Sequence, residues 1–121
     1  MIISCIDGEF CVCQPVDISA VDFDREFCFF AKTDEELSLV CKAEDAPERC
    51  IACEDGWSGF RISGVLDFSL VGILSEISSI LAASGISIFA VSTYNTDYIF
   101  VKSQSFEKAI EVLADNGYEI E

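Results

Sequence analysis

The sequence contains no histidine among its 121 residues. Without an imidazole, a serine or cysteine nucleophile lacks its usual neighbouring base, and an HExxH zinc motif cannot exist. The chain also has no glycine-rich phosphate loop of the Walker type. Pairs of acids are present, but in a chain this acidic they are expected without a catalytic role. These absences predict a protein that is not an enzyme and that carries no cofactor.

Basic residues are scarce, because seven Lys and Arg stand against 22 Asp and Glu and give a formal net charge of −15. The acidic excess is heavier in residues 1–55, with 14 acids and four bases, than in residues 56–121, with eight and three. Such a charge repels phosphate backbones and anionic lipid surfaces, so we expect neither nucleic acid nor a membrane as a partner. Solvation of a small protein with a large core explains the acids more simply than an acidic docking surface.

Long apolar runs are missing as well. The longest candidate for a membrane span, residues 66–83, is interrupted by Asp67, Gly72 and Glu76 and falls short of about 20 apolar residues. Residues 1–7 have neither the basic start nor the long apolar segment of an export signal. The hydrophobic share of 51% nevertheless indicates a globular protein with a substantial core. We therefore expect a soluble protein of the cytoplasm.

Cysteine is abundant, with seven residues, and an odd number cannot pair completely within one chain. In the reducing cytoplasm free thiols are expected. Cys11 and Cys13 alternate onto one strand face, and Cys50 and Cys53 have the spacing of a zinc knuckle or a redox pair. Cys11 and Cys13 lie in an apolar strand, and Cys50 and Cys53 lie in an acidic segment, so we expect no metal site. The alternative is a metal site at Cys50 and Cys53. Burial as small apolar residues explains most of the other thiols.

The first half of the chain, residues 1–55, predicts strands separated by polar segments. Apolar patterns indicate three strands, at residues 9–14, 26–32 and 37–41. Residues 16–25, between the first two strands, predict a loop with room for one helical turn. The second strand has too many consecutive apolar residues for one solvated face and should be covered on both sides. Thr33 and Glu36 match a capping box and predict a short helix. Charge and Pro47 mark residues 42–55 as a linker, and we place a domain boundary near residue 55.

The second half, residues 56–121, alternates between strand and helix patterns. Strands are expected at 57–63, 86–93, 98–102 and 118–120, with one helix at 69–84 and another after residue 105. Ser69 and Ser105 are suitable N-caps, and Gly85 and Gly117 stand where left-handed C-caps belong. The order is therefore strand, helix, strand, strand, helix, strand, which builds an antiparallel sheet with two helices on one face.

The strand at 86–93 is apolar on both faces. Ile88 and Ala90 point one way and Phe89 and Val91 point the other, yet the two helices can cover only one face. The second face has to be covered by the N-terminal half, by a second copy of the chain, or by both.

Several segments carry a resemblance to a known family. They are residues 56–57, 60–62, 64–74 (GVLDFSLVGIL), 83–89 (ASGISIF), 92–94 and 96–102 (TDYIFVK). Together they resemble small bacterial proteins of the ACT-domain superfamily, in the branch that includes the cytosolic arginine sensors of eukaryotes. Residues 29–41 (FFAKTDEELSLVC) resemble the N-terminal half of the same proteins, which hold two ACT-like units in tandem. The resemblance implies an α+β chain of two ferredoxin-like units, residues 1–55 and 56–121, the first of them abbreviated. It also implies an amino acid bound at an interface between ACT units.

A candidate ligand site can be located on this fold. The start of the first long helix offers free amides and the positive end of a helix dipole, which attract a carboxylate, and Gly72 lets a ligand approach the backbone closely. The hairpin near residue 95 supplies hydroxyls, an amide and a carboxylate to hold an α-ammonium group. We predict these ligand-binding residues: Asp67, Phe68, Ser69, Leu70, Val71, Gly72, Ser92, Thr93, Asn95, Thr96 and Asp97, with Ser38 as a weaker candidate. The alternative is that they only cap the helix and turn the chain.

The sequence thus predicts a sensor or regulatory module for an amino acid, which acts as a homodimer on a protein target that the sequence does not identify. Two alternatives stay open. One is a structural homodimeric interaction subunit, and the other is a thiol- or zinc-binding protein that uses Cys50 and Cys53.

Overall fold

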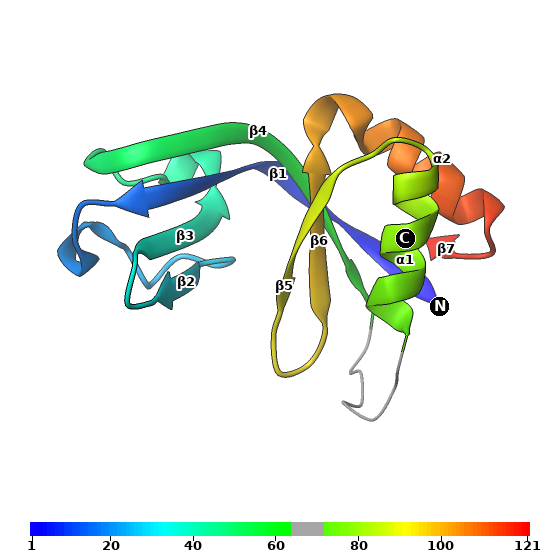
Figure 1. Ribbon diagram of the computed structural model, residues 1–121, viewed down its shortest axis with the longest axis horizontal. Coiled ribbons are helices and arrows are strands. Elements are labelled where there is room, and N and C mark those ends of the chain that lie inside the picture. Colours follow the sequence, from blue (N-terminus) through cyan, green and yellow to red (C-terminus); the bar gives the residue numbers. More distant parts are fainter. Residues whose placement is uncertain (64–71) are drawn as a thin grey trace. The chain divides into compact units, whose positions relative to one another are not determined.

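The computed structural model describes residues 1–63 and 72–121 (Figure 1). The regular elements in chain order are β1 (Ile2–Pro15), β2 (Phe29–Lys32), β3 (Leu37–Lys42), β4 (Cys50–Ile62), α1 (Ile73–Ala83), β5 (Ile88–Ser92), β6 (Asp97–Lys102), α2 (Phe106–Asp115) and β7 (Glu119–Ile120). Single 3₁₀ turns lie at Ile18–Ala20, Ala43–Asp45 and Ser103–Ser105. The mixture of an antiparallel sheet with two helices confirms the predicted α+β class.

The chain forms two compact units. Gly8–Trp57 makes the N-terminal unit, and Ser58–Glu121 together with Met1–Asp7 makes the C-terminal unit. The long strands β1 and β4 each contribute residues to both units. The first seven residues, which we grouped with the N-terminal half, therefore make their contacts within the C-terminal unit.

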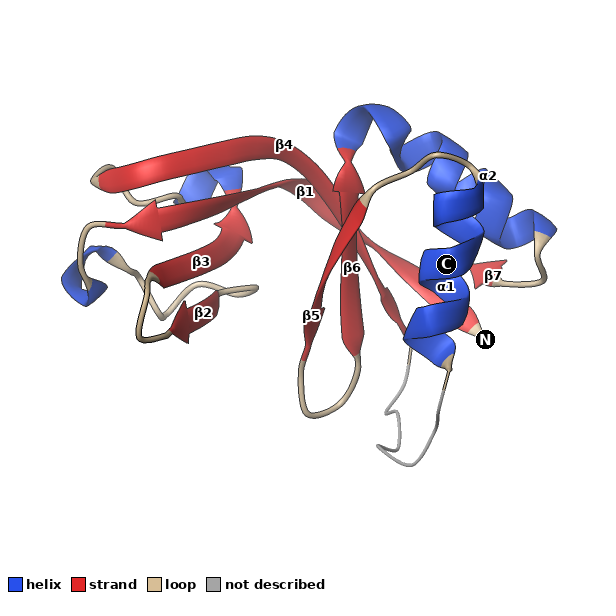
Figure 2. Cartoon of the chain, viewed as in Figure 1, coloured by secondary structure: helices blue, strands red, loops and turns tan. Residues whose placement is uncertain are grey.

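The C-terminal unit follows the predicted order strand, helix, strand, strand, helix, strand. β5 pairs antiparallel with β6, β6 neighbours β4, and β4 neighbours the first part of β1. β7 runs parallel to β1 on the other side, with Ile2 opposite Glu119. Both helices lie on the same face of this sheet (Figure 2). The start of the chain thus adds a strand between β4 and β7, which the sequence patterns did not indicate.

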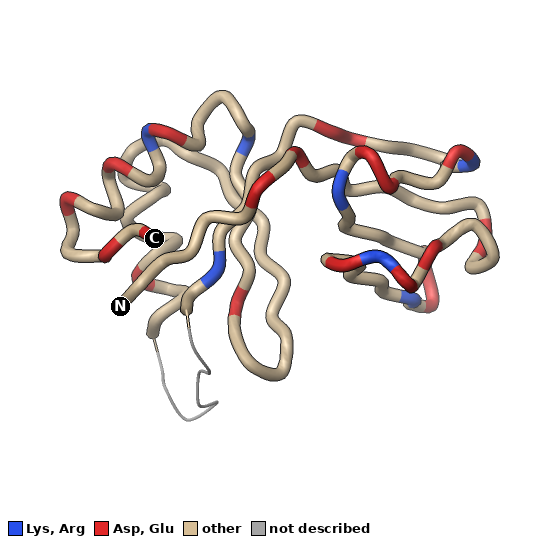
Figure 3. The backbone as a smooth tube through the Cα atoms, turned by 180° about the vertical axis from the view of Figure 1, so that it is seen from behind, with Lys and Arg blue, Asp and Glu red and all other residues tan. Residues whose placement is uncertain are grey.

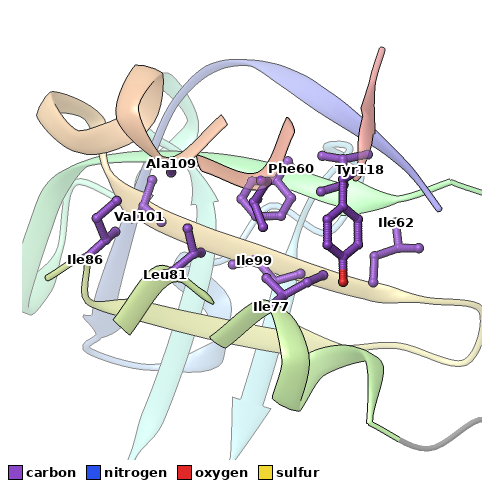
Figure 4. Packing of buried hydrophobic residues seen from close by; sticks show 11 residues of the cluster. Phe60, Ile62, Ile77, Leu81, Ile86, Ile99, Val101, Ala109 and Tyr118 are labelled. Atoms are coloured by element: carbon purple, nitrogen blue, oxygen red, sulfur yellow. The ribbon is translucent and has the colours of Figure 1, made fainter. Parts of the chain in front are cut away.

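The core of the C-terminal unit lies between the helices and the sheet (Figure 4). The sheet contributes alternate residues of β4 and β6, and each helix contributes one stripe: Phe60, Ile62, Ile99, Val101, Ile77, Leu81, Ala109 and Leu113. All eight are fully buried. Because strand side chains alternate between faces, the residues between them in sequence point to the opposite face. Burial of this apolar surface is the main term that stabilises the unit.

The helix C-termini are those that the sequence predicts. After α1 the N–H of Gly85 bonds to the carbonyl of Ala82 at 2.9 Å, and the N–H of Ile86 bonds to that of Leu81 at 3.0 Å. Gly85 has φ +74°, so the two bonds form a Schellman motif around a left-handed glycine. Gly117 closes α2 in the same way, with φ +95°.

The N-terminus of α1 differs from the prediction. The helix begins at Ile73, and Gly72 occupies the N-cap position with φ +86°. Ser69, which we expected as the N-cap, lies outside the described residues. At α2, Ser105 is the N-cap residue, but its side chain makes no capping hydrogen bond. The 3₁₀ turn that precedes it leads directly into the helix and takes over part of that role.

In the N-terminal unit the strand order is β2, β3, β1, β4. Gly8–Trp57, which the structure describes throughout, contains no α-helix, so the short helix predicted from Thr33 and Glu36 was wrong. The Thr33 hydroxyl does accept bonds from the amides of Glu35 and Glu36, both at 3.1 Å, but it caps a tight turn between β2 and β3. A capping threonine is compatible with a turn as well as with a helix, and the chain is already pairing as a strand at Leu37.

Two other predictions for this unit need correction. The second strand starts at Phe29 and not at residue 26, because Phe27 has φ +57°. This strand is also partly exposed, whereas we expected it to be covered on both faces. The segment 42–55 is only in part a linker, since β4 already begins at Cys50. The predicted helical turn in the loop 16–25 is present at Ile18–Ala20.

The hairpins of the two units repeat each other. Thr33 and Thr93 stand sixty residues apart, and the N–H of each bonds to the carbonyl of the third residue after it at 2.9 Å. The strands that follow, β3 and β6, have the same length and the same burial pattern, and each leads into a 3₁₀ turn. This repeat is the structural counterpart of two related units in tandem.

Candidate functional site

The β5–β6 hairpin of the C-terminal unit is fixed by its threonines. The Thr93 hydroxyl donates to the Thr96 carbonyl at 3.0 Å, which closes the turn. Thr96 is buried, and its hydroxyl donates to the carbonyl of Ile62 at the end of β4, at 2.8 Å. Both hydroxyls thus donate to backbone carbonyls, and these bonds position the hairpin.

The polar groups beside this turn are Ser92 and Asp97. They face each other across the hairpin, and the Ser92 hydroxyl donates to Asp97 Oδ1 at 2.5 Å. Strand alternation puts both on the face that carries the helices, since Asp97 has the same parity as the buried Ile99 and Val101. Asp97 is half-exposed and Asn95 is exposed. A carboxylate has about four acceptor positions, so Asp97 can accept an ammonium group as well as the Ser92 hydroxyl.

The N-terminus of α1 lies at the same end of the C-terminal unit as this hairpin (Figure 1). Gly72 is exposed, and its carbonyl accepts the first helical bond, from the Glu76 N–H, at 2.8 Å. The amides of the first helical turn have no acceptor within the helix and stand at the positive end of its dipole. The arrangement places the positive end of the α1 dipole and the Asp97 carboxylate at the same end of the unit.

The remaining predicted site residues divide into two groups. Asp67, Phe68, Ser69, Leu70 and Val71 lie outside the described residues. Ser38 belongs to the N-terminal unit, where it lines a hollow of about 410 Å³ together with Val12, Cys13, Gln14, Glu36, Ala52, Cys53 and Glu54. Ser38 thus belongs to a hollow of the N-terminal unit and not to the hairpin end of the C-terminal unit.

A second hollow, of about 590 Å³, lies in the C-terminal unit between the last turns of α1 and the start of β5. Its lining is small and partly hydroxylic: Ser78, Ser79, Ala82, Gly85, Ile86, Ser87 and Ile88. The sequence analysis did not single it out. The only available signal was the pair Ser78 and Ser79 on the helix face away from the apolar stripe.

The sheet face away from the helices carries an aromatic pair. Phe89 of β5 stacks on Phe100 of β6, with ring centroids 4.8 Å apart and planes 14° from parallel. Phe100 is fully buried, Phe89 is partly buried, and β5 is the edge strand of the sheet in the described residues. The predicted apolar second face is therefore present. On this face the ring of Phe89 covers part of Phe100.

Acidic residues are spread over both units (Figure 3). In the N-terminal unit Arg25 lies 3.3 Å from Asp22 and 3.7 Å from Asp45, and Arg49 lies 3.8 Å from Asp17. The arginines and two of the carboxylates are largely exposed, so these pairs contribute little to stability.

Six of the seven cysteines lie in the N-terminal unit, and Cys5 belongs to the C-terminal unit. Cys11, Cys13 and Cys41 are buried in one apolar cluster, against which Cys28 and Cys50 pack. The Cys50 thiol donates to the carbonyl of Pro47 at 3.2 Å, and Cys53 is exposed. In residues 1–63 and 72–121 no group of three or more cysteines and acids is arranged to hold a metal ion.

A family model for the ACT domain matches residues 52–115. The match spans more than half of the chain and covers both helices and the β5–β6 hairpin. The chain belongs to the ACT domain family. ACT domains are regulatory modules that bind small molecules, and the fold and the family together give this chain that general character. None of the helices in the described part of the chain is both long and apolar enough to span a bilayer.

Similarity to solved structures extends over nearly the whole chain. A protein from Agrobacterium tumefaciens is 29% identical with a TM-score of 0.84, over 98% of this chain and 90% of that one. Aspartate kinase of Clostridium acetobutylicum, described as an allosteric enzyme, gives 16% identity and a TM-score of 0.64, over 93% of this chain and 33% of that one. The ligand-free regulatory subunit of aspartate kinase from Thermus thermophilus gives 12% identity and a TM-score of 0.60, over 93% of this chain and 95% of that one. The last two show the fold alone. No curated protein matches the chain.

Proposed function

We propose that this ACT protein is a sensor that binds a free amino acid at the end of the C-terminal unit where α1 begins. The observation that carries the proposal is the position of Asp97, held by Ser92, at the same end of the unit as the α1 N-terminus. The ACT family supports a small-molecule ligand, and the two groups of opposite polarity suit a zwitterion.

The binding energy would come from both ends of the ligand. The α1 amides receive the α-carboxylate, for which the helix dipole alone contributes about 0.3–1 kcal/mol and charge-assisted hydrogen bonds contribute more. Asp97 receives the α-ammonium group. The predicted residues Asp67, Phe68, Ser69, Leu70 and Val71 connect β4 to α1 in sequence, and we propose that their amides complete the carboxylate site.

The sensor would act as a homodimer in the cytoplasm, with the ligand held at an interface between ACT units and the second copy of the chain supplying the partner unit. β5 supports this part, because it is the edge strand of the sheet in the described residues, and an edge strand can receive a further strand. A ligand that contacts two units stabilises one arrangement over the others, and a target protein responds to that shift in population.

Thermal unfolding in the presence of each of the twenty amino acids at millimolar concentration tests the proposal. We expect at least one to raise the midpoint, and we expect Asp97→Asn to lose that response while Asp115→Asn, an exposed acid on α2, keeps it. Absence of a response to every amino acid in the wild type, with a dimer unaffected by any of them, would favour a structural interaction subunit instead.

A further inference from the structure

The N-terminal unit has a core lined with thiols. Cys11 and Cys13 lie on one face of β1, and the cross-strand partners on β3 are Cys41 and Leu39. Cys11 has no exposed surface, and Cys13 and Cys41 are each 2% exposed. Buried thiols usually act as small apolar residues, and packing alone would not require two of them to face each other.

Cys11 and Cys41 are in direct contact. Their sulfur atoms are 3.7 Å apart, and the two residues are exact partners in the antiparallel register. Residues directly opposite in such a pair have Cα atoms about 4.5–5.5 Å apart, which lies within the range of about 4.4–6.8 Å that a disulfide spans. Side-chain rotation alone can therefore bring the sulfurs to bonding distance, with both strands in place.

We propose that Cys11 and Cys41 are an oxidisable dithiol that a peroxide closes to a disulfide between β1 and β3. The Cys11 thiolate attacks one oxygen of hydrogen peroxide, the O–O bond breaks, and the hydroxide that leaves takes up a proton to become water. Cys11 is then a sulfenic acid. The Cys41 sulfur attacks the Cys11 sulfur, its thiol proton joins the departing hydroxyl, and a second water leaves. Two thiols have lost two electrons, and the peroxide has gained them.

The contact between the thiols assigns their roles. A hydrogen bond from the Cys41 thiol lowers the pKa of Cys11 to about 7, despite its burial, so a substantial share of Cys11 is thiolate near neutral pH. The same bond, together with burial, raises the pKa of Cys41 above its ordinary value. Cys11 is thus the attacking thiol and Cys41 the resolving one.

The other thiols are less suited to either role. Burial raises the pKa of Cys13 and of Cys53, which keeps both protonated at neutral pH. Cys50 already donates to the Pro47 carbonyl. Cys13 and Cys53 line the hollow of about 410 Å³, which gives a small neutral oxidant a route to the edge of the cluster.

Peptide mapping tests the proposal on the full-length protein. Reduced protein is treated with hydrogen peroxide in equimolar amount, denatured, alkylated and digested with trypsin. The sequence is favourable, because cleavage after Arg25, Lys32, Lys42, Arg49 and Arg61 separates the thiols into peptides 1–25, 26–32, 33–42 and 50–61. We expect peptide 1–25 linked to peptide 33–42, reversed by dithiothreitol. Alkylated Cys41, or peptide 1–25 linked to 50–61 instead, would overturn the proposal.

Variants identify the residue within peptide 1–25. Cys11→Ser and Cys41→Ser should each abolish the linked peptide, whereas Cys13→Ser, on the same buried strand face, should retain it. The wild-type map keeps the test decisive if a buried serine prevents folding. A second readout is thermal unfolding, where oxidation should raise the midpoint of the wild type because the disulfide ties β1 to β3. A crosslink that appears only between two copies of the chain would contradict the proposal.

Discussion

The hydroxyl of Thr96 donates to the carbonyl of Ile62 across 2.8 Å inside the C-terminal unit. Ile62 is the last residue of β4, and Thr96 lies in the turn between β5 and β6. The bond thus joins the hairpin that carries Asp97 to the point where the chain leaves the sheet towards α1. It fixes the hairpin that carries Asp97 against the end of β4.

Replacement of Thr96 by Val should destabilise the protein by about 1–3 kcal/mol, because the buried Ile62 carbonyl loses its side-chain donor. Urea unfolding measures the change. Thr96→Ser keeps the hydroxyl and serves as the control, with a smaller loss expected. Equal stability of Thr96→Val and the wild type would show that the bond does not hold the hairpin.

Gly59→Ala should destabilise the protein through a steric clash. A Cβ at this position would lie 2.7 Å from the Phe100 ring, and neither β4 nor the stacked pair of Phe89 and Phe100 has room to move freely. The expected cost is about 1–3 kcal/mol, typical of an overpacked core. In a protein that already carries Phe100→Leu, the same Gly59→Ala change should cost less stability than it costs in the wild type.

Gly85→Ala provides the comparison for that experiment. A Cβ at Gly85 meets no atom within 4 Å, but φ is +74°, so its cost of roughly 1 kcal/mol comes from the backbone. Phe100→Leu should not recover it. If both glycine variants respond to Phe100→Leu in the same way, the steric account of Gly59 is wrong.

Tyr118 and Glu76 should make stability depend on pH in alkali. The Tyr118 hydroxyl donates to Glu76 Oε1 at 2.9 Å, and burial, then this bond, raises the pKa of Tyr118 from 10.0 to about 12. The folded state therefore holds the proton more tightly than the unfolded chain. The unfolding free energy should fall as the pH rises from about 10 to about 12, by about 2–3 kcal/mol in total.

Guanidinium unfolding of the wild type and of Tyr118→Phe, measured between pH 9 and 12, checks this prediction. The variant should lack the part of the slope that belongs to Tyr118, while its stability at pH 8 should be lower by the loss of one hydrogen bond, about 1 kcal/mol. Parallel slopes in the two proteins would mean that Tyr118 does not titrate differently on folding.

The parts of the fold that the sequence predicts best are those fixed by local chemistry. Gly85 and Gly117 had to be left-handed C-caps, because few other residues adopt a positive φ there, and both are. The buried stripes of α1 and α2 follow from helical periodicity. Thr33 shows the limit, because the same hydroxyl caps a turn or a helix, and only the pairing of β2 with β3 decides between them.

Long-range pairing was not predictable from local patterns. Nothing in residues 1–7 indicates that they pair with β7 at the far end of the chain, since strand propensity does not specify a partner. The contact between Cys11 and Cys41 depends on the β1–β3 register in the same way. Cysteines that are near each other in sequence, such as Cys50 and Cys53, are visible as a pair, and the sequence analysis therefore considered those two. Cys11 and Cys41 are thirty residues apart and become a pair only through the fold.

The hairpin of the candidate site was predicted, but the hydrogen bonds of its side chains were not. Ser92 and Asp97 do face each other, as a hairpin of that length requires, but Thr93 and Thr96 turn their hydroxyls to backbone carbonyls. A sequence shows that a residue has a hydroxyl and does not show which acceptor satisfies it. The hollow beside Ser78 and Ser79 was missed because small residues on a helix face give no distinctive pattern.

Isothermal titration of the wild type and of Asp97→Asn, with the amino acid that raises the thermal midpoint most, tests the central claim most directly. The account predicts saturable binding to the wild type, at least tenfold weaker binding to the variant, and an unchanged fold by circular dichroism. Equal affinity in the two proteins would contradict a site at Asp97, even if the amino acid binds elsewhere on the ACT fold.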